Sequence, residues 1–195
     1  PDNTREQTDS SKFMLRTDPP DHDRLRNLVS KAFTPAALAA LRPLVQDMVD
    51  TELDQIMPRG EMDLIEHLAL PVPAASMCAM LGVPFEDRNH LSDLVSHVTY
   101  LLASAAYPEL QPRAMTALEE LAGYMFKLIE QRRENPGNDI LSGLVQAEES
   151  GDTLSTEELL QQGIGLLVAG LETTIGLIGN GMRCFARNPE QFELL

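Results

Sequence analysis

Residues 163–174, which read GIGLLVAGLETT, lie at the centre of the stretch that decides the fold. That stretch runs from Thr156 to Arg187 without a proline, which predicts a single helix about 48 Å long at 1.5 Å per residue. From Ile164 to Ile178 the residues are apolar almost all round, so this helix is expected to run through a protein interior rather than along a surface. We therefore predict a mainly α fold with little or no β-structure, built around one long buried helix.

Prolines, glycines and capping residues mark the ends of the other helices. Ser155 and Glu158 have the spacing of a capping box at the start of the long helix. Asp21 is expected to cap the first helix, and Pro43 to bend the second helix rather than break it. The predicted helices cover residues 21–33, 35–57, 64–81 with an interruption near Pro71, 87–102, 112–133, 139–148 and 156–187, and a last one starts at Pro189.

The composition limits the class of protein. The 195 residues include 30 acidic and 15 basic ones, for a net charge of −15, and 43% are apolar. This apolar fraction can fill a sizeable core, whereas the acidic excess argues against nucleic acid as a partner. The sequence shows no signal peptide and no apolar run of the roughly 20 residues that a membrane span needs. We expect a cytoplasmic protein that does not bind membranes.

Residues 163–181 combine features that are costly inside a helix. They include six glycines, each of which destabilises a helix interior by about 1 kcal/mol. Gly170 is followed by Leu171, Glu172 and Thr173. The Thr173 hydroxyl is placed to donate a hydrogen bond to the carbonyl of Ala169. Small residues beside an acid and an alcohol suit a flat ligand lying on the helix, with a polar notch that passes protons. The alternative is close packing of helices through small residues, with Glu172 in solvent.

A second stretch, residues 18–26, carries a pair of hydrogen-bond donors. His22 and Arg26 are four residues apart, so they share one face of a helix. Two such donors suit a carboxylate or another anion, which an arginine can bind through two parallel hydrogen bonds. The alternative is a surface face on which Arg26 pairs with neighbouring acids.

Together the two stretches resemble the bacterial-type cytochromes P-450, which are haem-thiolate monooxygenases. The stretch from Asp18 to Thr34 is similar to that family's third helix, C, and residues 169–174 to the oxygen-binding signature of its central helix, I. The segments between and after them follow in the family's order: Leu68–Pro73, Leu81–Pro84, Asp139–Ser142 and Leu177–Gly181. The resemblance implies a partial P-450 fold, from about helix C to helix I or J, over residues 1–195.

The resemblance implies haem as the cofactor. His22 and Arg26 match the pair that binds the haem propionates. Ala169 and Gly170 match the small residues that let dioxygen and substrate lie over the iron. Met14 and Leu15 lie where the family's loop approaches the haem edge.

The resemblance also implies the catalytic residues. Glu172 and Thr173 match the acid and alcohol that deliver protons for oxygen activation. Gly165, Val168 and Ala169 would face a small organic substrate. The reaction expected of the family inserts one oxygen atom of O2 into that substrate.

The family's thiolate ligand has no counterpart in this sequence. Cys78 lies in a pattern typical of a helix core, and Cys184 lies near the end of the long helix without the glycines of a ligand loop. We predict no metal-ligating residue in this chain and expect the thiolate region to lie beyond Leu195. Residues 1–195 would then form a single incomplete domain. A non-catalytic helical binding protein, or an inactive fragment that lacks the cysteine ligand, is the rival interpretation.

Two further predictions concern partners. Tyr100 and Tyr107 lie where the family's substrate lid would be. Arg16, Arg24 and Lys31 form a local basic patch that would suit an acidic electron donor, a ferredoxin or a flavoprotein. The alternative for the patch is ordinary solubility.

Overall fold

The computed structural model describes residues 13–33, 35–103, 106–149 and 154–194, and every regular element within these ranges is helical. The α-helices are α1 (Asp21–Ala32), α2 (Pro35–Ile56), α3 (Pro71–Leu81), α4 (Arg88–Val98), α5 (Gln111–Glu134), α6 (Ile140–Glu149), α7 (Thr156–Arg187) and α8 (Pro189–Phe192). Short 3-10 turns cover Met14–Arg16, Met57–Arg59, Phe85–Asp87, Thr99–Ala103 and Pro108–Leu110, and one π-helical turn covers Ile65–Ala69. The predicted α class is therefore confirmed.

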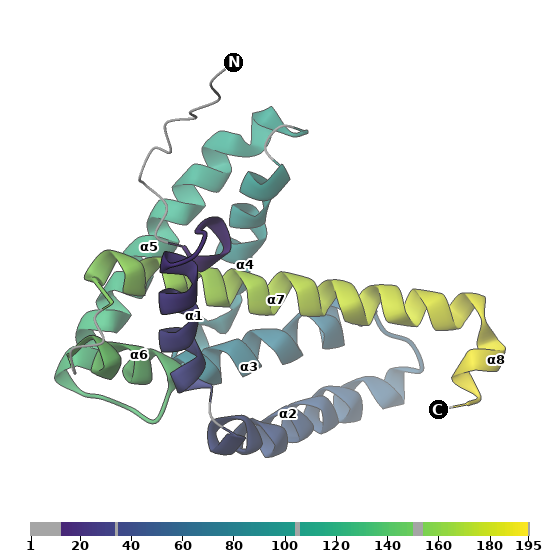
Figure 1. Ribbon diagram of the computed structural model, residues 1–195. Coiled ribbons are helices and arrows are strands. Elements are labelled where there is room, and N and C mark those ends of the chain that lie inside the picture. Colours follow the sequence, from purple (N-terminus) through teal and green to yellow (C-terminus); the bar gives the residue numbers. More distant parts are fainter. Residues whose placement is uncertain (1–12, 34, 104–105, 150–153, 195) are drawn as a thin grey trace.

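Helix α7 runs across the molecule as a long rod (Figure 1). Helices α3, α4 and α5 pack against it, α2 packs on α3, and α1 packs on α6 near the start of α7. The far end of α7 extends beyond α3 and turns into α8 (Figure 1). The chain thus forms helical layers on several sides of the first half of α7.

The first turn of α7 is held by the predicted capping box. The backbone N–H of Glu158 donates to Ser155 Oγ at 3.2 Å, and the backbone N–H of Ser155 donates to Glu158 Oε2 at 2.8 Å. Arg133 of α5 also donates to Thr156 Oγ1 at 3.0 Å. The helix begins and ends at the predicted residues because this cap and Asn188-Pro189 define its two limits.

Only part of α7 is interior. Leu159, Leu167 and Leu171 are buried, whereas none of residues 172–178 is, and Leu177 is 73% exposed. The prediction of an interior position thus holds to Leu171, and beyond it α7 is only partly covered by the described residues, since α3, α4 and α5 pack on the helix and leave part of its second half uncovered. By length and composition alone α7 could cross a membrane, but this is a weak indication, since core helices of soluble proteins share both features.

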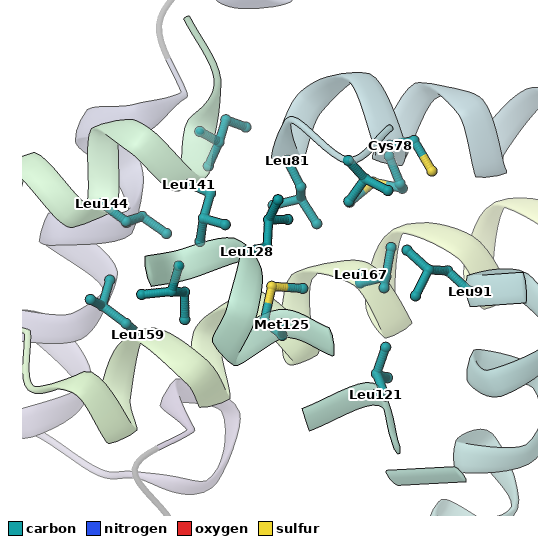
Figure 2. Close-up of a cluster of buried hydrophobic side chains, with 14 of the residues drawn as sticks. Cys78, Leu81, Leu91, Leu121, Met125, Leu128, Leu141, Leu144, Leu159 and Leu167 are labelled. Carbon is teal, nitrogen blue, oxygen red and sulfur yellow. The ribbon is translucent and has the colours of Figure 1, made fainter. Parts of the chain in front are cut away.

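The core gathers around α5 and the first half of α7. Figure 2 shows side chains from α3, α4, α5, α6 and α7 that point toward one another. Its labelled members are Cys78, Leu81, Leu91, Leu121, Met125, Leu128, Leu141, Leu144, Leu159 and Leu167. Each fully buried leucine side chain contributes about 2 kcal/mol through removal of apolar surface from water.

Two local predictions about proline and capping have different outcomes. Helix α2 continues through Pro43, so that proline does not break it, as predicted. The predicted cap at Asp21 is wrong: α1 already begins at Asp21, and Pro20 precedes it without a side-chain capping bond. Asp21 instead lies in the first turn, where a carboxylate favours the positive end of the helix dipole.

Gly82 lies at the end of α3, beside the residues that begin α6. It ends α3 with φ +70°, in the left-handed region, and its carbonyl accepts a hydrogen bond from the Arg132 guanidinium. Arg132 Nε also donates to Asp139 Oδ2 at 2.8 Å, and Asp139 Oδ1 accepts the backbone N–H of Ser142 at 2.7 Å. A Cβ at Gly82 would overlap the Asp139 carboxylate and the Arg132 guanidinium.

We expect Gly82→Ala to lower the free energy of unfolding by about 2 kcal/mol, since left-handed backbone costs a residue with a Cβ about 1–2 kcal/mol and the overlap adds to it. Gly123→Ala is the matched control. Gly123 lies inside α5 with no other side chain near its Cβ position, so alanine there should stabilise by about 0.5–1 kcal/mol. Urea unfolding followed by circular dichroism measures both, and equal effects would contradict the assignment of Gly82.

Candidate functional site

The predicted acid and alcohol lie on the exposed middle of α7. Ala169, Glu172 and Thr173 are all exposed, and Thr174 is half-buried. Thr173 Oγ1 donates to the Ala169 carbonyl at 2.6 Å, which confirms the predicted side-chain bond to the carbonyl four residues back. Thr174 Oγ1 makes the equivalent bond to Gly170 at 2.9 Å. This segment therefore presents a small side chain, a carboxylate and a hydroxyl on an open stretch of helix.

The glycines of α7 admit neighbouring side chains. A Cβ at Gly170 would overlap the thioether of Met77, and a Cβ at Gly165 would overlap the ring of Phe13. A Cβ at Gly163 would lie 3.0 Å from the sulfur of Met125. Helix packing, the alternative weighed for the glycines, accounts for all three positions.

The predicted contacts of these small residues with ligands stay predictions. Gly165 and Gly170 have protein atoms against the side that a Cβ would occupy. Val168 is half-buried and packs on the core, while Ala169 is exposed. Ala169 thus offers an uncovered small surface next to Thr173.

The predicted donor pair, His22 and Arg26, lies on α1. Leu25, Leu28 and Val29 bury one side of this helix, His22 is half-buried and Arg26 is exposed. His22 Nδ1 lies 3.1 Å from Asp23 Oδ1. Within the part of the chain that the structure describes, the Arg26 side chain makes no hydrogen bond or ion pair. The guanidinium is thus available to an anion, and pairing with neighbouring acids does not account for it.

Helix α1 and the segment before it are tied to the first turns of α7. Arg24 pairs with Glu158, whose side chain is 9% exposed. The backbone N–H of Met14 donates to Gln162 Oε1 at 3.3 Å, and Phe13 rests on Gly165. These contacts bring the helix that carries His22 and Arg26 alongside the helix that carries Thr173.

Arg24 was expected to belong to a basic patch with Arg16 and Lys31. Its guanidinium pairs with Glu158 while 42% of its side chain stays exposed, and the basic patch stays a prediction. The capping-box pattern identifies Glu158, whereas no pattern in the sequence indicates its pairing with Arg24. The one available signal was that Glu158 and Gln162 are polar and one turn apart on an otherwise apolar side of a helix.

Several charges shape the surroundings of these residues. Burial raises the pKa of Glu158, but hydrogen bonds from the Ser155 backbone and the Arg24 guanidinium outweigh burial and lower that pKa overall. Burial raises the pKa of the Cys78 thiol to about 11. Cys78 is only 2% exposed, which confirms its predicted place in the helix core, and Cys184 is exposed.

Among the described residues, no group of three or more His, Cys, Asp or Glu side chains converges into a candidate metal centre. Tyr100 and Tyr107 are 42% and 49% exposed, in the connection between α4 and α5. Their assignment to a substrate lid stays a prediction. Met14 is half-buried and Leu15 is exposed at the start of the described chain.

Known proteins identify the family. A family model described as "Cytochrome P450" matches residues 2–195, so the chain belongs to the cytochrome P450 family. It is 41% identical over 187 residues to cytochrome P450 107B1 of Saccharopolyspora erythraea, covering 96% of this chain and 44% of that protein. It is 40% identical over 185 residues to the cytochrome P450 monooxygenase PikC of Streptomyces venezuelae, covering 93% of this chain and 43% of PikC.

A solved structure shows the same fold. The myxobacterial cytochrome P450 CYP267B1, in complex with myristic acid, is similar with a TM-score of 0.85 and 40% sequence identity. The similarity covers 95% of this chain and 45% of CYP267B1. The chain thus spans somewhat less than half the length of these relatives, and the predicted resemblance to the family is confirmed.

The Arg24–Glu158 pair predicts a pH dependence of stability. Because the pKa of Glu158 is lowered in the folded protein, the pair stabilises fully above the ordinary value of 4.5, and this contribution is lost as the pH falls below 4.5. We expect Glu158→Gln to cost about 1–2 kcal/mol at pH 7, the value being limited by the partial exposure of Arg24. The difference from wild type should shrink below pH 4.5 in urea unfolding.

Glu157→Gln is the control for this measurement. Glu157 lies in the same first turn but its side chain is exposed, so its removal should change stability little at any pH. A Glu158→Gln effect that grows on acidification would contradict the assignment.

Proposed function

We propose that the full-length protein that carries this chain is a haem-dependent monooxygenase that inserts one oxygen atom of O2 into a small organic substrate. Membership of the cytochrome P450 family supports the general activity, and PikC is by name a monooxygenase. The single observation that carries the proposal is the exposed segment from Ala169 to Thr173, where a carboxylate adjoins a hydroxyl held on a carbonyl.

The residues fit the carboxylates and the flat face of a haem. On α1, His22 and Arg26 would bind the two propionates, and the Arg26 guanidinium has no other partner among the described side chains. On α7, Ala169 and Gly170 would lie over the porphyrin, where a larger side chain at the exposed Ala169 would obstruct it. When bound, haem supplies the redox-active iron at which dioxygen is reduced.

Glu172 and Thr173 would move protons in this reaction. The Thr173 hydroxyl donates a hydrogen bond to the Ala169 carbonyl, which holds the hydroxyl oxygen in one place. The lone pairs of that oxygen are left to accept a hydrogen bond from another group. Glu172 is next to it in sequence and carries the carboxyl that would take up protons and pass them on. Insertion of one oxygen atom releases the other as water and consumes two electrons and two protons, which such a relay would supply.

The remaining parts of the proposal lie partly outside these 195 residues. We infer that the thiolate ligand of the iron comes from another part of the full-length protein, since Cys78 is buried in the core and Cys184 lies at the end of α7. Electrons would come from a ferredoxin or a flavoprotein. Gly165, Val168 and Ala169 would face the substrate, and the protein would act in the cytoplasm.

The full-length protein provides the first test. We expect its reduced carbon-monoxide complex to show the red-shifted Soret band of thiolate-ligated haem, which absorption spectroscopy measures directly. A protein that binds no haem, or whose carbon-monoxide complex has the Soret band of histidine-ligated haem, would instead support the rival interpretation of a non-catalytic helical binding protein.

Thr173→Ala tests the relay. Loss of the hydroxyl should leave haem content unchanged but reduce the product formed per electron pair consumed by about tenfold or more, because proton delivery is impaired. Thr174→Ala is the matched control, since Thr174 makes the same kind of bond one residue further on. Product and hydrogen peroxide are measured against cofactor consumption, and unchanged coupling in Thr173→Ala would count against the relay.

A further inference from the structure

Two buried polar side chains on α7 face the segment that leads into α1. Within the described part of the chain, Glu158 and Gln162 are two of four buried polar or charged residues, exposed to 7% and 0%. They lie one helical turn apart, so they belong to the same side of α7. Gly165, three residues beyond Gln162, continues that side.

Each of these positions holds a different part of the leading segment. The Glu158 carboxylate pairs with Arg24 through one oxygen and caps the Ser155 backbone through the other. Gln162 accepts the Met14 backbone N–H at 3.3 Å, and Gly165 receives the ring of Phe13. The three contacts form a seam between α7 and the chain from residue 13 to residue 24.

Of the three contacts in the seam, the Arg24–Glu158 pair is the one that bears on the rotation of α1 about its own axis. Arg24 is two residues from His22 and two from Arg26, so at 100° per residue it projects to the opposite side of the helix from both. When Arg24 is fixed on Glu158, the directions in which His22 and Arg26 project are fixed as well. Figure 1 shows α1 crossing beside the first turns of α7.

The apolar contacts of α1 set this rotation only coarsely. Leu25, Leu28 and Val29 are buried, which determines the side of α1 that faces the core, but hydrophobic contact is non-directional and tolerates small rotations. An ion pair with one exposed partner adds little net stability, whereas its hydrogen bond has a preferred direction. The Arg24–Glu158 pair, in which Glu158 is buried and the Arg24 side chain is 42% exposed, has the position needed to refine the rotation that the apolar residues set.

We propose that Arg24 and Glu158 are positioning residues for the haem-propionate clamp formed by His22 and Arg26. This inference rests on the proposed function. It assigns to the pair an effect on how firmly the cofactor is held, exerted through the two clamp side chains rather than by contact with the cofactor.

The test measures the rate at which haem leaves the full-length holoprotein for an excess of apomyoglobin. We expect Glu158→Gln to raise that rate about tenfold, as loss of an orienting partner typically does. Arg24→Met, which keeps the apolar stem, should have a similar effect, while Arg24→Lys should restore part of the loss. Glu157→Gln, which removes a charge from the exposed side of the same turn, should stay within about twofold of wild type.

A second background separates positioning from general loosening of the fold. In the double variant His22→Ala/Arg26→Ala the clamp is gone, so adding Glu158→Gln should increase haem loss by less than about twofold. A purely structural role predicts the same tenfold factor in both backgrounds. Resonance Raman bands of the propionate groups should also shift in Glu158→Gln and not in Glu157→Gln.

The outcomes are distinct. The proposal is overturned if Glu158→Gln and Arg24→Met release haem at the wild-type rate, or if the Glu158→Gln factor is undiminished without the clamp. Should Glu158→Gln fail to fold, the same two comparisons with Arg24→Met decide the matter. If the His22→Ala/Arg26→Ala variant holds haem as wild type does, the clamp itself is wrong, and the proposed function loses its cofactor site together with this inference.

Discussion

Burial of one side of the first half of α7 is the constraint on which the rest of the structure depends. Leu159, Leu167 and Leu171 must leave water, and α3, α4 and α5 supply the surfaces that cover them. Once these surfaces are in place, the axis of α7 is set, and the turn Ile65–Ala69 contacts its second half near Gly179. The segment from Ala169 to Thr173 is therefore positioned by the packing of residues on both sides of it.

Small residues on α7 serve two separate ends. At Gly163, Gly165 and Gly170 the missing side chain is replaced by the side chain of a neighbour, and the packing gained offsets the roughly 1 kcal/mol that each glycine costs the helix. At Ala169 the small side chain faces no covering element and remains exposed. Glycine content alone therefore indicates close packing, and the exposed alanine beside Thr173 is the small residue that the proposed ligand surface uses.

The sequence predicted the helices better than the contacts between them. The limits of α7 follow from the Ser155 and Glu158 capping box at one end and from Asn188-Pro189 at the other, and both are local signals. Pairing of Arg24 with Glu158 joins residues 134 apart in the chain, and no local pattern encodes it. For the same reason exposure beyond Leu171 was missed, since apolar composition records what a helix can bury and not which neighbours cover it. Family motifs identified His22, Arg26, Glu172 and Thr173, but they did not indicate what holds the two pairs together.

Helix α1 is held from two sides by two kinds of interaction, and the difference has a physical meaning. Toward the core it presents leucine and valine, whose burial determines the side of α1 that faces inward but tolerates small rotations. Toward α7 it presents Arg24, which meets a carboxylate already committed to the cap of α7. That carboxylate cannot move without opening the first turn of α7. The direction of the Arg24 side chain is therefore fixed relative to the backbone of α7. Apolar side chains at Arg24 and Glu158 can match or exceed the stability of the pair, but they would supply no directional contact to refine the rotation of α1. A site built from side chains on both helices needs α1 to keep one rotation about its axis. The contact between Arg24 and the buried Glu158 carboxylate favours one such rotation.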